Sequence, residues 1–389
     1  MKNLLLSKVF FIFGTCISSI FLNFFIFQYT NSLNETLIFD IYYFASMPFF
    51  AFVAGIVSKF LSSKVSCILG LFFNILTLLL VLFFPSFILS HSYILGLIQG
   101  ISGGFYFSST NNLSQHLTNM NNREDFNAKT SIFSNVASVI VPLFTALIVA
   151  ATKSYTLVFI VATIFYFCSF IYLIPIKYIE PKSNFRPIYT LLIIRKNNDT
   201  WLSFKAIFIM GIYQGIAFTL LPILILITLP NIGWWGVYQT FLAILSIILT
   251  VYYQKMFKQD KAKYPLLLYS FMFAIVGLIL SVNYNQIVFF IYTILNTIMV
   301  VIIYVSYTSI IQNITDEYKE FENRIIEKNI IDEFSLNSGR FLILLLIFLC
   351  PVKDFKNYSS ISIIFLLLTV LPFCVSLYLC RANILRSKE

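Results

Sequence analysis

The chain has 389 residues, of which 59% are hydrophobic and 11% are charged, and its formal net charge at pH 7 is +10. An ordinary soluble domain carries about a quarter charged residues, so this composition excludes a water-soluble globule. The six cysteines fall within apolar runs, without CxxC spacing or clustered metal-ligating partners, which argues against a disulfide framework and a zinc site. The composition instead predicts an all-α integral membrane protein whose solvent is the lipid bilayer.

Twelve apolar runs follow one another along the chain. A membrane-spanning helix needs about 20 mostly apolar residues. Six runs lie at residues 8–29, 36–58, 65–84, 91–113, 130–151 and 155–177, and six more lie at 204–228, 233–254, 264–282, 285–311, 339–351 and 359–380. The sequence therefore predicts 12 transmembrane helices in two six-helix halves, 1–177 and 204–389, joined by a polar linker at 178–203.

The basic residues indicate how the predicted spans are oriented. Lysine and arginine accumulate on cytoplasmic loops. Of the 26 basic residues, 23 fall on the side of both termini and the linker, and the opposite side holds Lys153, Lys353 and Lys356. We therefore expect a multi-pass protein of the cell membrane with both termini cytoplasmic. Topology and attraction to anionic lipid explain the positive charge, without a nucleic-acid partner.

An internal repeat relates the two halves, because short motifs recur at a nearly constant offset. Phe11-Ile12-x-Gly14 returns as Phe208-Ile209-x-Gly211, 197 residues later. Tyr106-x-Ser108-x-Thr110 returns as Tyr304-x-Ser306-x-Thr308, 198 residues later. An offset of about half the chain is the pattern of transporters built from two related six-helix halves.

Together, the twelve spans, the repeat, the basic middle loop and the cytoplasmic termini resemble the major facilitator superfamily over essentially the whole chain. The superfamily's loop motif between spans two and three, G-x-L-A-D-R-x-G-R-K, matches residues 55–64 at Gly55 and Lys64. Lys59 and Phe60 stand where the motif has an acidic residue and an arginine. The resemblance therefore implies the major facilitator fold with an altered cytoplasmic gate network.

Further motif remnants bear on the type of transport. Gln99 and Gly100 match the antiporter-type R-x-x-Q-G motif without its arginine, and Pro142 matches the exporter-type G-x-x-x-G-P motif. Segments 122–127 and 337–340 resemble a bacterial drug-exporter-like branch. The resemblance implies a secondary active transporter that exports a small amphipathic or neutral compound by alternating access, with a proton or another ion as a possible coupling partner.

Two other functions stay open from the sequence. The chain could be a facilitator or importer of a neutral solute, or a degenerate transporter fold that acts in immunity, sensing or assembly without transport. An enzyme is not expected. The sequence shows no Ser/His/Asp set, no metal-ligand cluster and no glycine-rich phosphate loop, so we expect neither catalysis nor a cofactor.

Spans one, four, seven and ten line the central cavity in this superfamily, and polar residues recur at helical spacing on these spans. Gln99, Gly103, Tyr106 and Thr110 form one stripe of span four, whereas Leu95 is expected to face lipid. The residues that we expect to bind solute are Asn23, Gln99, Tyr106, Thr110, Tyr213, Gln214, Asn296 and Tyr304. The predicted cavity holds nothing ionisable at mid-depth, which suits a neutral or amphipathic solute.

Two groups of charged residues lie at the ends of the spans. Asp40 is the one acidic residue inside a predicted span, near its outer end. Proton coupling through Asp40 is one interpretation, and a hydrated interfacial carboxylate is the one that we favour from the sequence.

An amphipathic helix is predicted over 316–336. A cytoplasmic gate is expected to use Lys59, Arg123, Glu333 and Arg340.

The orientation can be tested by cysteine labelling. We expect a cysteine placed at Asn184, in the linker, to resist an impermeant thiol reagent in intact cells, because the basic residues put the linker in the cytoplasm. The same cysteine should react once the cells are permeabilised. Labelling in intact cells would reverse the predicted orientation.

Overall fold

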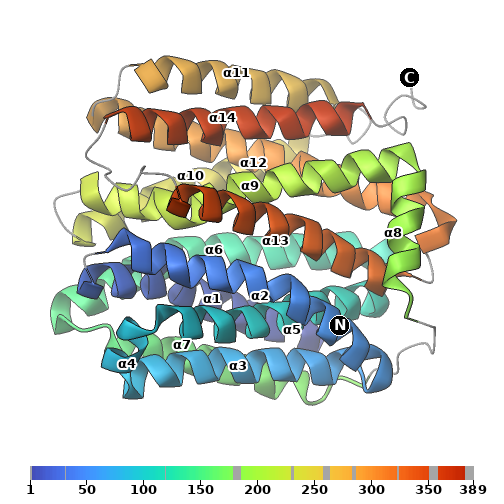
Figure 1. Cartoon of the computed structure of the whole chain (residues 1–389), viewed down its shortest axis with the longest axis horizontal. Coiled ribbons are helices and arrows are strands. Elements are labelled where there is room, and N and C mark those ends of the chain that lie inside the picture. Colours follow the sequence, from blue (N-terminus) through green and yellow to red (C-terminus); the bar gives the residue numbers. More distant parts are fainter. Residues whose placement is uncertain are drawn as a thin grey trace. The chain divides into compact units, whose positions relative to one another are not determined.

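The computed structural model describes residues 2–30, 32–118, 120–177, 185–228, 232–256, 263–282, 286–321, 324–349 and 358–381. Within these ranges every regular element is a helix, which confirms the predicted all-α class (Figure 1). The helices of the first half are α1 (Lys2–Thr30), α2 (Leu33–Phe60), α3 (Ser63–Phe83), α4 (Pro85–Ser90), α5 (Ser92–Leu117), α6 (Met120–Thr152) and α7 (Thr156–Leu173).

A short helix, α8 (Pro187–Lys196), follows the first half. The remaining elements are α9 (Asn198–Thr228), α10 (Ile232–Met256), α11 (Lys263–Val282), α12 (Gln286–Glu317), η2 (Lys319–Phe321), α13 (Ile325–Leu349) and α14 (Tyr358–Cys380). Each of the twelve predicted spans falls on a different long helix. Hydropathy alone did not predict α4, α8 and η2, because these short elements are not long enough to cross a bilayer.

Two long helices extend well beyond their predicted spans. Helix α6 begins at Met120 instead of near 130, and α13 begins at Ile325 instead of near 339. The helix predicted over 316–336 is therefore not a separate element: α12 ends at Glu317, and α13 continues without interruption into the span. Extending an existing helix costs less than nucleating a new one, so helices run past the apolar segment that hydropathy detects.

By length and hydropathy of the described residues, seven helical segments are able to cross a membrane. They are Lys2–Thr30, Leu33–Phe60, Ser63–Phe83, Ile132–Thr152, Thr156–Leu173, Asn198–Leu221 and Ile363–Cys380. Shorter apolar stretches lie within α10, α11 and α12. Helix α5 does not qualify, because its glycine, serine and amide residues lower its mean hydropathy. A long helix of this composition suits a position among other helices better than a lipid-facing one.

The chain divides into two compact units. The first comprises Met1–Phe185 with Pro222–Ala243, and the second comprises Arg186–Leu221 with Ile244–Glu389. In the first unit α3 packs against α5 and α7, and in the second α11 packs against α12 and α14. The offset of about 197 residues maps α3, α5 and α7 onto α11, α12 and α14. The repeat seen in the sequence therefore recurs in the helix packing.

Helices α2 and α5 approach so closely that only hydrogen atoms fit between them. Gly96, Gly100 and Gly104 recur at every fourth position of α5, and we call them the α5 seam. A Cβ atom at these positions would lie 2.3, 2.5 and 2.6 Å from the carbonyl oxygens of Phe39, Tyr43 and Met47. Lipid provides no hydrophobic force between helices, so van der Waals contact across small residues is a main source of association.

A second seam joins α9 to α13 in the other unit. A Cβ atom at Gly211 would lie 2.0 Å from the carbonyl oxygen of Leu336, and one at Gly339 would lie 2.2 Å from that of Phe208. Close by, the Ser335 hydroxyl donates to the carbonyl oxygen of Phe204 at 2.9 Å. We call Gly211, Gly215 and Gly339 the α9–α13 seam. It fixes the rotation of α13 about its axis, and hence the direction of its polar side chains.

We expect Gly104→Ala to destabilise the purified protein by about 1 to 3 kcal/mol, the usual cost of overpacking a close contact. This loss should occur although alanine favours a helix over glycine by about 1 kcal/mol. The measurement is the thermal unfolding midpoint in one detergent. Leu97→Ala on the same helix, where Leu97 is 37% exposed, is the control and should shift the midpoint little. Equal midpoints for Gly104→Ala and the native chain would contradict the seam.

Candidate functional site

The first polar pair of the N-terminal unit joins α1 to α2. The Asn23 Nδ2 donates to the Asp40 Oδ2 at 3.2 Å, and the two residues are 9% and 4% exposed. The expectation of a hydrated interfacial carboxylate is therefore wrong. Helix α2 begins at Leu33, so Asp40 lies two turns inside it, and its side chain turns toward α1. A buried carboxylate needs a partner or a proton, because burying an isolated charge is costly.

The second pair joins α5 to α3. The Gln99 Nε2 donates to the Asn74 Oδ1 at 3.1 Å, and the Asn74 Nδ2 donates to the carbonyl oxygen of Gly70 at 3.4 Å. Gln99 is half-buried and Asn74 is buried. Asn74 was not among the expected site residues. The signal that could have identified it is an amide within the otherwise apolar run 65–84, where an unpaired polar group is costly.

Tyr106 and Thr110 are buried and do not lie on an open face, so their assignment to the solute site stays a prediction. The Tyr106 ring is buried and stacks on Phe11 of α1, with ring centroids 3.4 Å apart and planes at 13°. The Thr110 Oγ1 donates back to the carbonyl oxygen of Tyr106 at 2.8 Å. Leu95, expected to face lipid, is 0% exposed. Both sides of α5 are covered because it packs against α2 and α3.

In the second unit, two residues predicted from the sequence lie together. The Tyr213 hydroxyl of α9 donates to the Asn296 Oδ1 of α12 at 3.5 Å, a long hydrogen bond. Tyr213 is buried and Asn296 is half-buried. The side chains of Tyr304 and Arg123 fall outside the described part of the structure, so their proposed roles remain predictions.

Arg340 contacts Gln214, one of the residues expected to bind solute. Its Nη2 donates to the Gln214 Oε1 near the middle of α9, and its Nη1 donates to the Asn337 Oδ1 at 2.8 Å. The guanidinium carbon lies 5.8 Å from the centre of the Phe218 ring. An ionisable side chain therefore lies beside a residue expected to bind solute, which the sequence did not predict. Span eleven was predicted to start at 339, which put Arg340 at its end, whereas α13 begins at Ile325.

Two carboxylates of α13 precede its apolar segment and are half-buried. Burial raises the pKa of Glu333, and the positive charge of Arg340 and a hydrogen bond from Asn337 lower it in part. The Asn337 Nδ2 donates to the Glu333 Oε2 at 3.1 Å. Burial likewise raises the pKa of Asp332, although Lys328 opposes that shift with an ion pair at 2.6 Å. The Glu333, Asn337, Arg340 and Gln214 side chains thus form one network.

The residues expected to form the cytoplasmic gate are only partly connected in the structure. Glu333 and Arg340 share the α13 network through Asn337. Lys59 is half-buried in the last turn of α2, and its role as a gate residue stays a prediction. Lys64, the retained last residue of the loop motif, donates from Nζ to the carbonyl oxygen of Ile174 just beyond α7. A cation at a helix C-terminus satisfies an otherwise unpaired carbonyl group, so Lys64 ties α3 to α7.

Comparison with known proteins identifies the class to which this fold and these sites belong. The family model for the Major Facilitator Superfamily matches residues 4–320. The chain therefore belongs to the major facilitator superfamily, whose members are membrane transporters and typically not enzymes. No curated protein matches the sequence.

Two solved structures are similar over almost their whole length. The crystal structure of a D-xylose-proton symporter has a TM-score of 0.69 and 10% sequence identity, and the match covers 98% of this chain and 97% of that chain. The crystal structure of the E. coli fucose:proton symporter has a TM-score of 0.68 and 15% identity, and the match covers 97% of this chain and 98% of that chain. At these identities the similarity shows the major facilitator fold.

The raised pKa of Glu333 predicts a pH-dependent stability. Above the ordinary value of 4.5 the unfolded carboxyl loses its proton, whereas the folded carboxyl keeps it until the pH reaches its raised pKa. The folded state binds more protons in that window, so the unfolding midpoint should fall as the pH rises. Glu333→Gln should make this slope shallower, and Glu320→Gln, at an exposed position, should not. An unchanged slope in Glu333→Gln would contradict this assignment.

Proposed function

We propose that the chain is a proton-coupled secondary transporter of a small neutral or amphipathic solute that forms hydrogen bonds. The observation that carries the proposal is the buried Asp40 carboxylate paired with Asn23. Ionisable residues within membrane helices are costly and are commonly the proton relays of transporters. A buried carboxyl group can hold a proton in its neutral form within the membrane region. It can then release that proton where water reaches it.

Within each unit, considered by itself, there are hydrogen-bonding side chains of the kind that bind a neutral solute. The first unit offers Asn23, Asn74 and Gln99, and the second offers Tyr213, Gln214 and Asn296. Amides both donate and accept hydrogen bonds, so they match hydroxyl, carbonyl or amide groups of a neutral molecule. Arg340, which donates to Gln214 and Asn337, adds a cationic guanidinium beside these amides and suits a solute with a strong acceptor. Alternating access about such groups is the mechanism of superfamily members.

Proton coupling is also favoured by the similar solved structures, since both are named as proton symporters. The same names favour uptake of the solute together with protons. Export is favoured by the partial exporter motif that ends at Pro142 and by segments 122–127 and 337–340, which resemble drug exporters. A proton gradient drives accumulation of the solute in the case of uptake and its expulsion in the case of export. The test must therefore also determine the direction of transport.

We expect Asp40→Asn to abolish coupling, because an amide cannot carry a proton through the cycle. Proteoliposomes that contain the purified chain and a trapped pH-sensitive dye are given a panel of neutral sugars and amphipathic compounds. The native chain should produce a solute-dependent internal pH change, and Asp40→Asn should lower it at least about tenfold, the effect of losing about 1.4 kcal/mol. Glu35→Gln, nearer the start of α2, is the matched control and should keep the signal.

The outcome discriminates between the candidate functions. A full pH signal in Asp40→Asn would show that another group carries the proton. The sign of the signal under an imposed gradient separates uptake from export. Absence of any flux with a correctly folded native chain across the panel would favour the alternative of a transporter fold without transport.

A further inference from the structure

Helix α8 leads into the start of α9 and lies against α13 within the second unit (Figure 1). One side of α8 is covered: Thr190 and Ile194 are buried, and Ile194 joins Phe321 and Ile331 in a small apolar core. Trp201, Phe204 and Tyr318 pack against the same core. The helix is therefore part of the folded unit.

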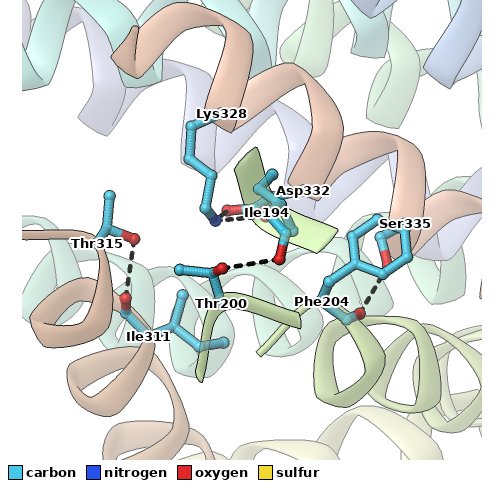
Figure 2. A network of polar contacts seen from close by, with 8 residues as sticks. All are labelled: Ile194, Thr200, Phe204, Ile311, Thr315, Lys328, Asp332 and Ser335. Atoms are coloured by element: carbon cyan, nitrogen blue, oxygen red, sulfur yellow. Dashed lines mark hydrogen bonds and ion pairs between the residues drawn. The ribbon is translucent and has the colours of Figure 1, made fainter. Parts of the chain in front are cut away.

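Polar contacts hold α8 in this position. The backbone N–H of Arg186 donates to the Glu327 Oε1 at 3.2 Å, just before the first turn of α8. At its other end, the Thr200 Oγ1 donates to the carbonyl oxygen of Ile194 at 2.9 Å (Figure 2). Both ends of α8 are thus fixed to neighbouring helices. The direction of its uncovered face is determined by the fold.

The uncovered face of α8 is apolar along its first two turns and basic at its end. Ile188 is 76% exposed and Leu192, one turn later, is 58% exposed. Arg195 and Lys196 are exposed in the last turn. A solvated face would be expected to carry polar residues, so an exposed apolar strip beside cations indicates a partner. We call Ile188, Leu192, Arg195 and Lys196 the outer face of α8.

We propose that the outer face of α8 lies in the head-group layer of the bilayer and binds anionic phospholipid. Ile188 and Leu192 insert among the acyl chains, and Arg195 and Lys196 pair with lipid phosphates. This is the arrangement of interfacial amphipathic helices, which combine buried apolar area with attraction to anionic lipid. Each basic residue near an anionic leaflet adds to this attraction.

Two further observations place the bilayer surface at α8. Trp201 follows α8 within five residues, and the Lys205 Nζ lies 5.3 Å from the centre of its ring. Tryptophan and basic residues mark the membrane interface. Moreover, six basic residues lie between Lys177 and Lys205, more than in any other loop of the sequence. Charge complementarity therefore favours an anionic lipid surface as the occupant of this face.

The depth of the outer face is measured on the full chain with its native cysteines replaced. Nitroxide labels on Ile188→Cys and Leu192→Cys are compared with a label on Asn198→Cys, an exposed polar position at the start of α9. In nanodiscs, the two α8 labels should be accessible to oxygen and protected from a water-soluble nickel chelate. The Asn198→Cys label should be accessible to the chelate. Chelate access at Ile188→Cys and Leu192→Cys would overturn the proposal.

The requirement for anionic lipid is tested by measuring the unfolding midpoint of the chain in nanodiscs. Adding phosphatidylglycerol to phosphatidylcholine nanodiscs should raise the unfolding midpoint of the native chain. Arg195→Gln with Lys196→Gln should lose most of that rise. The control, Lys2→Gln with Arg381→Gln, removes the same charge from exposed positions outside the basic segment 177–205 and should keep it. An equal rise in both double variants would overturn the proposal. A second result would also overturn the proposal: in lipid-free detergent, the Leu192→Cys label is protected from the nickel chelate and two chains crosslink. A second copy of the chain would then cover the face instead of lipid.

Discussion

Close contact between helix backbones is the constraint on which the rest of this structure depends. In a bilayer, apolar side chains gain nothing by leaving lipid, so helices associate through van der Waals contact and interhelical hydrogen bonds. The α5 seam and the α9–α13 seam supply that contact where a single methyl group would collide with a carbonyl oxygen. Gln99 adjoins Gly100 and Gln214 adjoins Gly215. The two glycine seams therefore also determine where the amides point.

Electrostatics then distinguishes the two units. The first holds a carboxylate, Asp40, against the amide of Asn23, and the second holds a guanidinium, Arg340, against the amides of Gln214 and Asn337. A buried charge survives only with partners, because its desolvation costs more than most single contacts return. Retaining charged groups within the helix packing of both units is difficult to explain by packing alone. It suits a protein that exchanges protons and binds a polar solute during a conformational cycle.

Hydropathy alone predicted the helices well but the site less well. Apolar runs located each of the twelve long helices within the described residues, since bilayer thickness imposes a length that is readable in the sequence. Periodicity put Gln99 and Tyr106 on one stripe of α5, yet it could not tell that α1 and α3 cover Tyr106. The contact of Arg340 with Gln214 was missed because hydropathy ends a span where charges begin, whereas α13 continues through them. Asn74 became a candidate only when the structure showed its hydrogen bond with Gln99.

Helix α13 connects these features mechanically. It runs unbroken from Ile325 to Leu349, so its charged first turns and its apolar segment move as one body. The Lys328–Asp332 ion pair and the contact with α8 lie at its start, and Arg340 lies further along, against Gln214. A proton on Glu333 weakens the local compensation of Arg340. Because α13 is one continuous helix whose Glu333, Asn337 and Arg340 side chains are linked by hydrogen bonds, we expect a change at its charged end to reach Arg340 and Gln214.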